Sequence, residues 1–448
     1  MPALTASIRP TAAVIGAGVS GLTAAYILSR THDVTLFESD HRLGGHAHTH
    51  DVRGGDGQAL RIDSGFIVHN ERTYPHLLRL FRELEVPTQP TEMSMSVTCG
   101  ACGLSYAGGR GLRGILAQPR RLADPRFVRM LTEVPRFHRA ARVLLESTPG
   151  DADSIDGTSG TSGTSSSAQG ATRNDPTWAQ FLARGRYSDY FVRHFALPLV
   201  ACVWSSADTD AGAYPARHLF QFLEHHGMLT VTGAPTWRTV TGGSATYVDR
   251  LAGHLTDVRR DSAVTAVSRH DDIVEVRTAG DRVETFDRAV VATHADQAMA
   301  LLVDATPDEK EDLGAIRYSV NETWLHRDSS VLPATTAARA SWNYRMRCDG
   351  PADQVLVSYW MNRLHGVQDS DDHIVTLNPT GQVDPAAVTA QMTYAHPIFT
   401  HEAVAAAARL RTAGGDRLAF AGAHLGWGFH EDGCRSGVEA AQSLGVAW

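Results

Sequence analysis

The sequence predicts an α/β fold, and three observations in residues 12–38 support this prediction. A short apolar run, Ala12 to Ile15, is typical of a buried parallel strand. Glycines in the spacing G-x-G-x-x-G follow it and lead into an Ala/Leu-rich helix. A second apolar run, 34–37, then ends on the acid Glu38. Strand, glycines, helix, strand and acid in this order predict a Rossmann-type dinucleotide site.

Each residue of the glycine loop has a physical role in such a site. Gly16 permits the tight turn, Gly18 lets the backbone approach a pyrophosphate, and Gly21 lets helix and strand pack closely. The helix N-terminus, at Val19 and Ser20, offers unpaired N–H groups and the positive end of the helix dipole. These residues therefore predict a pyrophosphate contact.

The segment after the second strand distinguishes a nicotinamide from a flavin cofactor. Glu38, followed by Ser39, is placed to accept hydrogen bonds from an adenosine ribose. Arg42 then precedes the diglycine Gly44-Gly45, a second point of close backbone approach. This array of strand, glycine loop, helix, strand and E-x3-R-x-G-G resembles the flavoproteins of the amine oxidase superfamily, where the diglycine passes close to FAD.

The resemblance covers roughly 90% of the chain and implies a two-domain organisation with bound FAD. It implies a glutathione-reductase-like FAD-binding Rossmann domain assembled from three chain segments, 1–65, 241–310 and 415–448. An α+β substrate domain is expected from 66–240 and 311–414. Within it, the Ser/Thr/Gly-rich stretch 150–174 predicts a flexible loop, because it has little apolar surface to bury.

A narrower resemblance concerns residues 62–86, IDSGFIVHNERTYPHLLRLFRELEV. This run is similar to uncharacterised bacterial NAD/FAD-binding proteins and to the flavin-containing N-terminal part of plant cyclopropane fatty acid synthases. Residues 361–365 and 377–379 match the same group. The narrower resemblance implies a substrate with a lipid acyl chain.

The superfamily resemblance also implies FAD contacts further along the chain. The backbone at Gly65-Phe66 is expected to return towards the flavin, and Val264 is expected to contact adenine. The closing segment 422–433 is expected to lead into a helix whose N-terminus faces the cofactor. Ala423 stands where an acid usually follows the first glycine of that segment. The full set expected from the resemblance beyond the N-terminal unit is His46, Gly65, Phe66, Val264, Thr293, Gly422, Phe429, Glu431 and Asp432. Covalent attachment of flavin through His46 or Cys434 stays an open alternative.

Acid–base candidates come from the same cofactor-facing segments. His430 and Glu431 are predicted to be catalytic, since histidine transfers protons readily near neutral pH. The alternative for each is a packing or cofactor contact. Amine oxidases of this fold usually hold a lysine through a water near flavin N5. The only lysine here is Lys310, in TPDEKEDLG, where a solvated helix face is expected.

An apolar helical region between residues 178 and 224 predicts a substrate pocket. Its motif CVWSS places Trp204 where the superfamily has a tryptophan–serine pair. Trp204, Tyr359 and Trp427 are expected to line the pocket. Ordinary helical core is the alternative for each of these aromatic residues.

Two groups of metal-ligating residue types occur without a complete ligand set at zinc spacing. His46, His48 and His50 alternate on an expected strand, and Cys99 and Cys102 form a C-x-x-C at the turn of an expected hairpin. A polar strand face and turn chemistry are favoured, respectively, so the sequence predicts no metal.

Composition limits partners and location. The formal net charge is −8, which argues against nucleic acid as a partner. The chain has 5 cysteines, an odd number that favours a reducing compartment. No apolar run approaches the ~20 residues of a membrane span. A cytoplasmic protein is therefore expected, and peripheral membrane contact stays open.

Together these patterns predict an FAD-dependent oxidoreductase that dehydrogenates, desaturates or isomerises an apolar, fatty-acyl or polyene-like substrate. The sequence has a single dinucleotide motif, so no separate nicotinamide domain is expected. Electrons from the reduced flavin are therefore expected to pass to oxygen, to a partner acceptor or back to the substrate. One alternative is an amine oxidase that uses oxygen. Another is a non-catalytic flavin-binding accessory protein of a lipid-modifying enzyme, with a methyltransferase as the partner.

Overall fold

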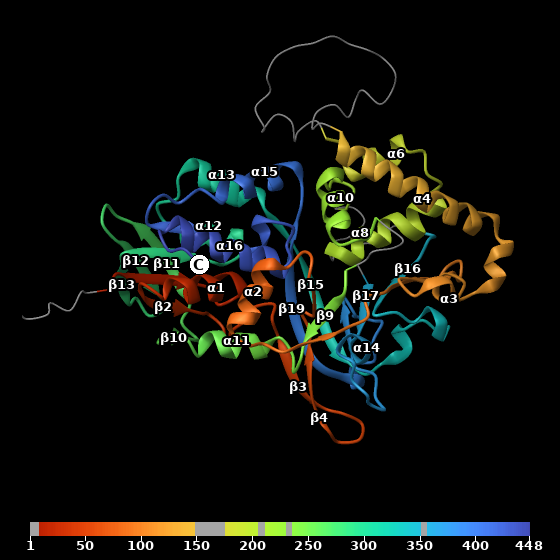
Figure 1. Cartoon of the computed structure of the whole chain (residues 1–448), viewed down its shortest axis with the longest axis horizontal. Helices are drawn as coiled ribbons and strands as arrows, with labels where there is room; N and C mark the ends of the chain where they lie inside the picture. The colour runs from red at the N-terminus through yellow and green to blue at the C-terminus, as the bar shows by residue number, and fades with distance from the viewer. Residues whose placement is uncertain (1–8, 148–174, 205–210, 230–234, 351–355) are drawn as a thin grey trace, which may run out of the picture.

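The computed structural model describes residues 9–147, 175–204, 211–229, 235–350 and 356–448. Figure 1 shows a dinucleotide-type sheet with its helices at one end, a large sheet in the middle and a helical layer at the other end. The loop predicted at 150–174 lies outside the described residues. Within the described ranges, none of the helices combines the length and the apolar composition needed to cross a membrane.

A parallel sheet with the strand order β10-β2-β1-β14-β20 forms the centre of the first region. Its members are β10 (Asp257–Arg259), β2 (Asp33–Phe37), β1 (Thr11–Ile15), β14 (Arg288–Val291) and β20 (Leu418–Phe420). Strand β1 lies in the middle, and its residues 12–15 are almost completely buried. Helices and a meander cover both faces, so most residues of the central strands β1, β14 and β20 are buried and apolar. Three distant chain segments thus supply one sheet.

Helices α1 (Val19–Leu28) and α16 (His430–Ser443) cross on one face of this sheet. All residues of α1 except Tyr26 are buried, which explains its small and mostly apolar side chains. The crossing is very close, since a Cβ at Gly437 would lie 2.3 Å from the Ser20 carbonyl oxygen. Glycine at 437 therefore brings the N-terminal and C-terminal helices together.

Residues 264–286 form an antiparallel meander, as their alternation of apolar and polar residues indicates. It consists of β11 (Val264–Arg269), β12 (Val274–Thr278) and β13 (Val283–Phe286) in antiparallel order. Further helices of this region are α11 (Ala245–Ala252), α12 (Ala295–Leu301), α13 (Pro307–Ala315) and α15 (His401–Leu410).

A mixed sheet with the order β19-β15-β18-β17-β16-β7-β8 runs through the middle of the molecule. Its strands are β7 (Met95–Cys99), β8 (Ser105–Gly108), β15 (Arg317–His326), β16 (Trp342–Met346), β17 (Leu356–Trp360), β18 (Ile374–Leu377) and β19 (Val388–Ile398). The hairpin predicted around Cys99 and Cys102 is confirmed as β7–β8. Strand β19 was missed by the sequence analysis, because many of its residues are polar or only partly buried. It is an edge strand, which also tolerates Pro397.

Smaller sheets join the two regions. Strands β3 (Thr49–Arg53) and β4 (Ala59–Asp63) form a hairpin. Strands β5 (Val68–Asn70), β9 (Trp237–Val240) and β6 (Thr88–Pro90) form a second antiparallel sheet. Helix α2 (Pro75–Glu83) packs against α16.

The helical layer has a core rich in aromatic rings, including Phe137, Trp178, Phe191 and Phe220. Its elements are α3 (Gly111–Ile115), η1 (Pro119–Ala123), α4 (Pro125–Glu146), α6 (Trp178–Arg184), α7 (Asp189–Phe191), the π-helical turn η3 (Val192–Ala196), α8 (Leu197–Trp204) and α10 (Ala216–His225). The remaining short helices are η4 (Ser329–Val331), η5 (Thr336–Ala338), α14 (Met361–His365), η6 (Pro385–Ala387) and η7 (Ala423–Leu425).

The expectation of a solvated face on the segment TPDEKEDLG is wrong for two of its acids. Glu309 and Asp312 are buried, and they pair with Arg269 and Arg409, respectively. Lys310 itself is exposed on α13, as expected. Helix α13 is therefore held to its surroundings by charged pairs rather than lying free on the surface.

Candidate functional site

The glycine loop between β1 and α1 has the geometry that its sequence predicts. Gly16 has φ +98°, and a Cβ there would lie 2.8 Å from the Ala292 carbonyl oxygen. A Cβ at Gly21 would lie 1.9 Å from the Gly16 oxygen, so only glycine allows this helix-to-strand contact. A Cβ at Gly18, in contrast, meets nothing within 4 Å. Helix α1 begins there without a side-chain cap, which leaves its first N–H groups directed to this side of the loop.

The diglycine packs directly on the glycine loop. Gly44 donates its N–H to the Ala17 oxygen at 2.8 Å, and a Cβ at Gly45 would lie 3.2 Å from the Gly18 Cα. Both residues have positive φ, of +105° and +56°. The predicted second point of close backbone approach therefore adjoins the first.

Glu38 ties the end of β2 to the same loop. Its carboxylate accepts hydrogen bonds from the backbone N–H of Ala17 at 2.8 Å and of Asp40 at 2.9 Å. Ser39 donates its hydroxyl to this carboxylate at 3.1 Å. Arg42 lies nearby, 3.5 Å from Asp40, and is about one-quarter exposed.

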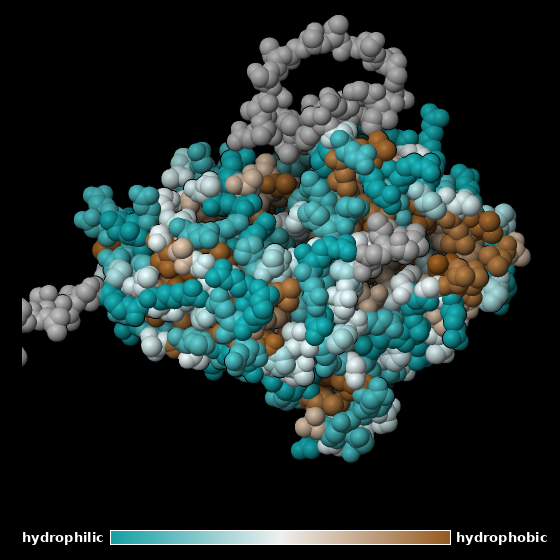
Figure 2. Space-filling view, viewed as in Figure 1, coloured by the Kyte–Doolittle hydropathy of each residue, from teal (hydrophilic) through white to brown (hydrophobic). Residues whose placement is uncertain are grey.

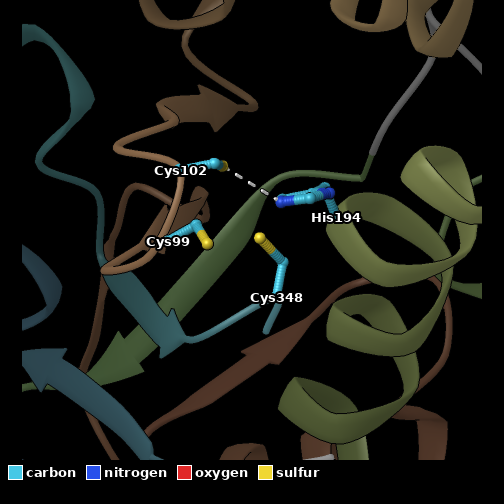
Figure 3. Close-up of side chains that lie close together, drawn as sticks. All are labelled: Cys99, Cys102, His194 and Cys348. Carbon is cyan, nitrogen blue, oxygen red and sulfur yellow. Dashed lines mark hydrogen bonds between the residues drawn. The ribbon is translucent and has the colours of Figure 1, made fainter. Parts of the chain in front are cut away.

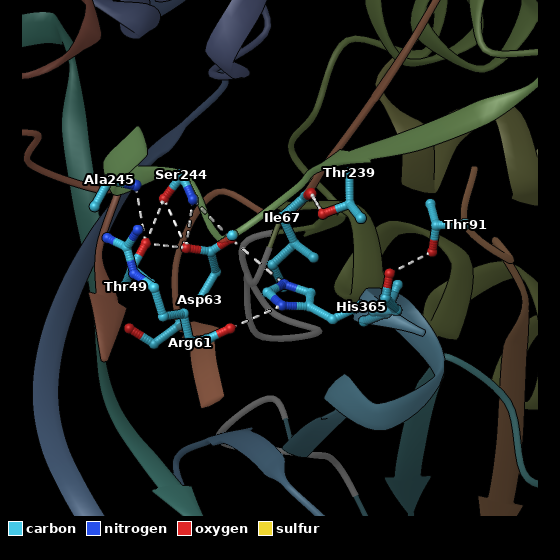
Figure 4. A network of polar contacts seen from close by, with 12 residues as sticks. Thr49, Arg61, Asp63, Ile67, Thr91, Thr239, Ser244, Ala245 and His365 are labelled. Atoms are coloured by element: carbon cyan, nitrogen blue, oxygen red, sulfur yellow. Dashed lines mark hydrogen bonds and ion pairs between the residues drawn. The ribbon is translucent and has the colours of Figure 1, made fainter. Parts of the chain in front are cut away.

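Asp63 is a buried residue at the centre of a polar network that precedes the Gly65-Phe66 segment (Figure 4). It was not among the site residues predicted from the sequence. Its carboxylate accepts from the Ser244 N–H at 2.9 Å and from the hydroxyls of Ser244 and Thr49, and it lies 3.4 Å from His365 Nε2. Burial alone would raise the pKa of Asp63, but the contact with His365 and hydrogen bonds from Thr49 and Ser244 hold it below its usual value. This network joins β3, β4, α11 and α14 immediately before Gly65.

The Gly65-Phe66 segment then turns back onto the diglycine region. Phe66 donates its N–H to the His46 oxygen at 2.7 Å, and a Cβ at Gly65 would lie 2.0 Å from the same oxygen. The structure thus brings His46, Gly65 and Phe66 together, as the resemblance implied for a cofactor-facing segment.

The strand expected to align His46, His48 and His50 begins only at Thr49, so the predicted common face is wrong. The His48 and His50 rings lie 4.0 Å apart, while His46 lies against Tyr394 and His396 of β19 at 4.9 and 5.6 Å. Burial, His396 and His294 hold the pKa of His46 well below its usual value. His48 Nδ1 also lies 3.1 Å from the Tyr394 hydroxyl, so Tyr394 links the His48–His50 pair to His46.

Residues after β14 and β20 approach the glycine loop from other segments. Thr293 would lie 3.4 Å from a Cβ at Gly16, which places it beside the loop. Gly422 donates its N–H to the Ser436 hydroxyl at 2.9 Å, which ties β20 to α16. Val264 opens β11 of the meander.

Asp432 shapes the closing segment. It accepts a hydrogen bond from the Phe429 N–H at 3.1 Å and pairs with Arg435 at 3.0 Å. Burial raises the pKa of Asp432 to about 6, against the opposing effect of Arg435. A Cβ at Gly426 would lie 2.1 Å from this carboxylate, so the loop folds tightly over it.

The two predicted acid–base residues have different surroundings. His430 is buried, and its Nε2 lies 2.6 Å from the Tyr247 hydroxyl. The Glu431 carboxylate accepts from the N–H groups of His76 and Leu77 at 3.0 and 2.9 Å and pairs with His76 Nδ1 at 2.7 Å. Helix α2 has no cap of its own, so Glu431 caps it from α16. These contacts favour a structural role for Glu431 over the predicted catalytic one.

Two of the expected pocket residues meet at the closing segment. Trp204 donates its indole N–H to the Trp427 oxygen at 3.0 Å, and Phe222 stacks on Phe429 at 4.4 Å. Tyr359 lies on β17, where its ring meets Trp342 at 5.4 Å. The aromatic helical layer thus packs directly on the segment that leads into α16.

Comparison with known families agrees with this geometry. The family of flavin-containing amine oxidoreductases matches residues 19–444, nearly the whole chain. The chain belongs to this family. It is accordingly an FAD-dependent oxidoreductase, and FAD is its cofactor.

Individual relatives are distant. Tryptophan 2-monooxygenase from Allorhizobium ampelinum is 52% identical over 48 residues, which is 10% of this chain and 7% of that protein. The structure of cyclohexylamine oxidase from Brevibacterium oxydans has a TM-score of 0.67 at 16% identity, with 97% of this chain and 98% of that chain covered. A fatty acid isomerase from P. acnes that produces CLA has a TM-score of 0.65 at 16% identity, with the same coverage. These likenesses establish a common mixed α/β fold.

The residues of the loop fit the FAD of this family. A Cβ at Gly18 would enter the space beside the uncapped start of α1, where a pyrophosphate is favoured by backbone N–H groups. Gly45 borders the same space through Gly18. A side chain at either position would occupy it.

Sequence reasoning missed several residues that adjoin this flavin-family site. Tyr394 and His396 come from the missed strand β19, and His294 stacks on Tyr318 at 4.5 Å. His294 lies three positions after the end of β14, which was a usable signal. The contact between Tyr247 and His430 joins α11 to α16 and could not be read from the sequence.

Proposed function

We propose that the chain acts on an apolar substrate with a fatty-acyl or polyene-like chain, by dehydrogenation, desaturation or double-bond isomerisation. The observation that carries the proposal is the aromatic wall at the closing segment. Trp427 lies 5.7 Å from His218 and 6.4 Å from Phe222, and Trp204 lies 5.0 Å from Phe222. Rings of this kind bind apolar chains through buried area rather than through charge.

The proposed flavin domain comprises residues 1–65, 241–310 and 415–448, and the proposed substrate domain comprises 66–240 and 311–414. The glycine loop and α1 would hold the pyrophosphate, Glu38 the ribose, and the closing segment with α16 the flavin end. FAD supplies a two-electron acceptor when it is bound. The further proposed contacts are Val19, Ser20, Ser39, Arg42, Gly44, Gly45, His46, Gly65, Phe66, Val264, Thr293, Gly422, Phe429 and Asp432.

His430 is the proposed proton-handling residue. Burial lowers its pKa to about 3, so the ring is neutral at physiological pH. Burial also raises the pKa of Tyr247 well above its usual value, so its hydroxyl keeps its proton, and it lies 2.6 Å from His430 Nε2. The pair thus holds one shared proton in an apolar setting, a suitable arrangement for redox-neutral isomerisation as well as for oxidation.

An exposed apolar surface supports peripheral contact with a membrane. Leu112, Leu122 and Val128 are 75%, 50% and 39% exposed. The neighbouring Arg113 and Arg120 are also exposed. Figure 2 shows hydrophobic side chains gathered at the end of the molecule where α4 lies. Apolar and cationic side chains together favour an anionic lipid surface, the natural source of an acyl substrate.

Amine oxidation is the second candidate. It is favoured by the family and by the likeness to cyclohexylamine oxidase. The position of Lys310 argues against it. Its side chain is exposed on α13, whereas a lysine next to flavin N5 would lie beside a buried cofactor. The resemblance to plant cyclopropane fatty acid synthases supports a lipid substrate, and it also keeps an accessory role beside a methyltransferase as a third candidate.

A substrate screen under anaerobic conditions tests the proposal. The purified flavoprotein is first photoreduced to show that its flavin accepts electrons. Unsaturated and hydroxylated fatty acids and cyclohexylamine are then added separately to oxidised enzyme. We expect a fatty acid to bleach the flavin, or to be recovered as an isomer by mass spectrometry, and cyclohexylamine to leave the spectrum unchanged.

Matched variants sharpen the screen. Trp427→Ala should raise the KM for the fatty acid, whereas Trp448→Ala, at the C-terminus, should not. Lys310→Met should leave flavin reduction intact. Bleaching by cyclohexylamine that is lost in Lys310→Met would establish amine oxidation instead. A photoreducible flavin that no substrate of either class reduces, with no isomer formed, would establish the accessory role.

A further inference from the structure

Three cysteines and a histidine from distant parts of the chain meet at the edge of the helical layer (Figure 3). The ligand atoms of Cys99, Cys102, His194 and Cys348 all lie within 4.8 Å of one another. Figure 3 shows the four side chains turned toward a common point. Only the C-x-x-C pair is apparent from the sequence, because the other two donors are not at zinc spacing in the chain.

The elements that supply the donors hold them rigidly. Cys99 ends β7, and Cys102 follows in the turn to β8, where Gly103 has φ +70°. Gly103 donates its N–H to the Cys99 oxygen at 3.0 Å, which closes the turn. Cys348 follows β16, which runs parallel to β7 with Met346 opposite Cys99. Parallel pairing therefore delivers the third sulfur to the C-x-x-C turn.

His194 presents its Nε2 to the sulfur atoms. Its Nδ1 lies 3.0 Å from the Tyr190 carbonyl oxygen, which can only accept, so Nδ1 carries the proton. The lone pair of Nε2 then points at Cys102 Sγ, 3.4 Å away. The histidine lies in the π-helical turn η3, and its ring is stacked on Tyr190 at 4.1 Å. A carbonyl that fixes the tautomer in this way is the usual support of a metal-ligating histidine.

The surroundings suit a site with net negative charge. A divalent cation with three thiolates and a neutral imidazole has a formal charge of −1. Arg121 donates to the Cys102 oxygen at 2.6 Å, and Arg193 donates to the Cys348 oxygen at 2.6 Å. Both guanidinium groups thus lie beside ligand residues, offset the charge and hold the ligand backbone in place.

We propose that Cys99, Cys102, His194 and Cys348 bind one structural Zn²⁺. Zinc–sulfur bonds of about 2.3 Å and zinc–nitrogen bonds of about 2.0 Å place tetrahedral donors roughly 3.5 to 3.8 Å apart. The 3.4 Å contact and the 4.8 Å limit bracket these separations, so small side-chain rotations complete the tetrahedron. Four protein donors leave no open position, which makes the site structural rather than catalytic.

The zinc would add a further link among the three elements that supply its ligands. The β7–β8 turn, the end of β16 and η3 belong to the mixed sheet and to the helical layer. Helix α8 directly follows η3 and ends at Trp204, so the metal would also anchor the helix that carries part of the proposed aromatic wall. This inference does not depend on which substrate the enzyme uses.

Metal analysis of the purified full-length flavoprotein tests the site. We expect about one zinc per chain by inductively coupled plasma mass spectrometry, since such sites bind tightly at neutral pH. Cys348→Ser and His194→Ala should each lower zinc at least about tenfold. Cys202→Ala, a buried cysteine on α8 outside the cluster, should retain it. FAD content is measured in parallel and should be unchanged in folded variants.

Cobalt provides a readout that does not require the variants to fold. Wild-type protein treated with chelator and then with Co²⁺ should show thiolate-to-cobalt charge transfer and strong d–d bands of tetrahedral coordination. Removal of zinc should also lower Tm while the chain still binds FAD. Folded wild-type protein with less than about one-tenth zinc per chain and no such cobalt bands would overturn the proposal. So would peptide mapping that finds Cys99 in a disulfide with Cys102 or Cys348.

Discussion

His430 stacks face to face on Phe66, with ring centroids 3.7 Å apart and ring planes inclined by 8°. The two residues come from the closing segment and from the Gly65-Phe66 turn, so the stack joins two segments that the resemblance assigns to the flavin. At the edge of the imidazole ring, Nε2 lies 2.6 Å from the Tyr247 hydroxyl. His430 is therefore held in one orientation and one protonation state.

Substitution of His430 tests its role in proton handling. We expect His430→Ala to lower turnover about 100-fold, within the range of general acid–base catalysis, while FAD is largely retained. His270→Ala, at an exposed position, is the matched control. Turnover and the ratio of flavin to protein are measured on the substrate found by the anaerobic screen. Equal losses of FAD and activity would show that His430 only supports the cofactor.

Glu431 is expected to act on stability. In Glu431→Gln one acceptor oxygen becomes an NH₂ group, so a buried N–H of the α2 N-terminus loses its partner. We expect a loss of about 1–3 kcal/mol in the free energy of unfolding, measured by urea denaturation. Glu439→Gln, in a partly exposed ion pair of the same helix, should cost less than about 1 kcal/mol. If turnover falls with no loss of stability, Glu431 is catalytic as the sequence predicted.

The glycine loop is tested through FAD retention. Gly18→Val places a branched side chain beside the start of α1, where the pyrophosphate is expected, and should abolish FAD binding. Glu38→Ala should weaken it. Gly314→Val, on the exposed side of α13, should retain full flavin content. Flavin content is measured by absorbance of the purified proteins. A yellow, fully loaded Gly18→Val protein would contradict the proposed pyrophosphate site.

Buried histidines predict a loss of stability in mild acid. Burial lowers the pKa of His396 to about 4 and those of His424 and His430 to about 3. The unfolded chain binds protons below pH 6.5 while the folded chain excludes them, so the free energy of unfolding falls as the pH falls. Asp432, with its pKa raised to about 6, has the opposite effect and offsets part of the loss.

These three histidines and Asp432 together should lower the free energy of unfolding by about 2 kcal/mol from pH 6.5 to 5.5. Other buried histidines with lowered pKa values, among them His218 and His226, add to this loss, which is measured by urea denaturation of the holoenzyme. His424→Asn should reduce this pH dependence by about one proton, and the exposed His270→Asn should leave it unchanged. Stability that is constant or rises over this range would show that the histidines are protonated in the folded protein.

The sequence by itself determined the elements whose determinants are local. The β1–α1–β2 unit follows from glycines at fixed spacing between apolar strands, because the positive φ of Gly16 and the close contact of Gly21 with Gly16 arise within the unit itself. The β7–β8 hairpin and the β11–β13 meander follow from alternation and turn residues. Neighbours along the chain decide these structures, so the pattern suffices.

Only the tertiary structure decided which distant side chains meet. Strand β19 is recognisable through its pairing with β15, and it carries His396 to His46. Glu431 caps a helix more than 350 positions earlier in the chain. The sulfur of Cys348 reaches the C-x-x-C turn only because β16 pairs with β7 in one register. Such contacts depend on strand order and register, which are set by burial across the whole molecule and leave no spacing signal in the sequence.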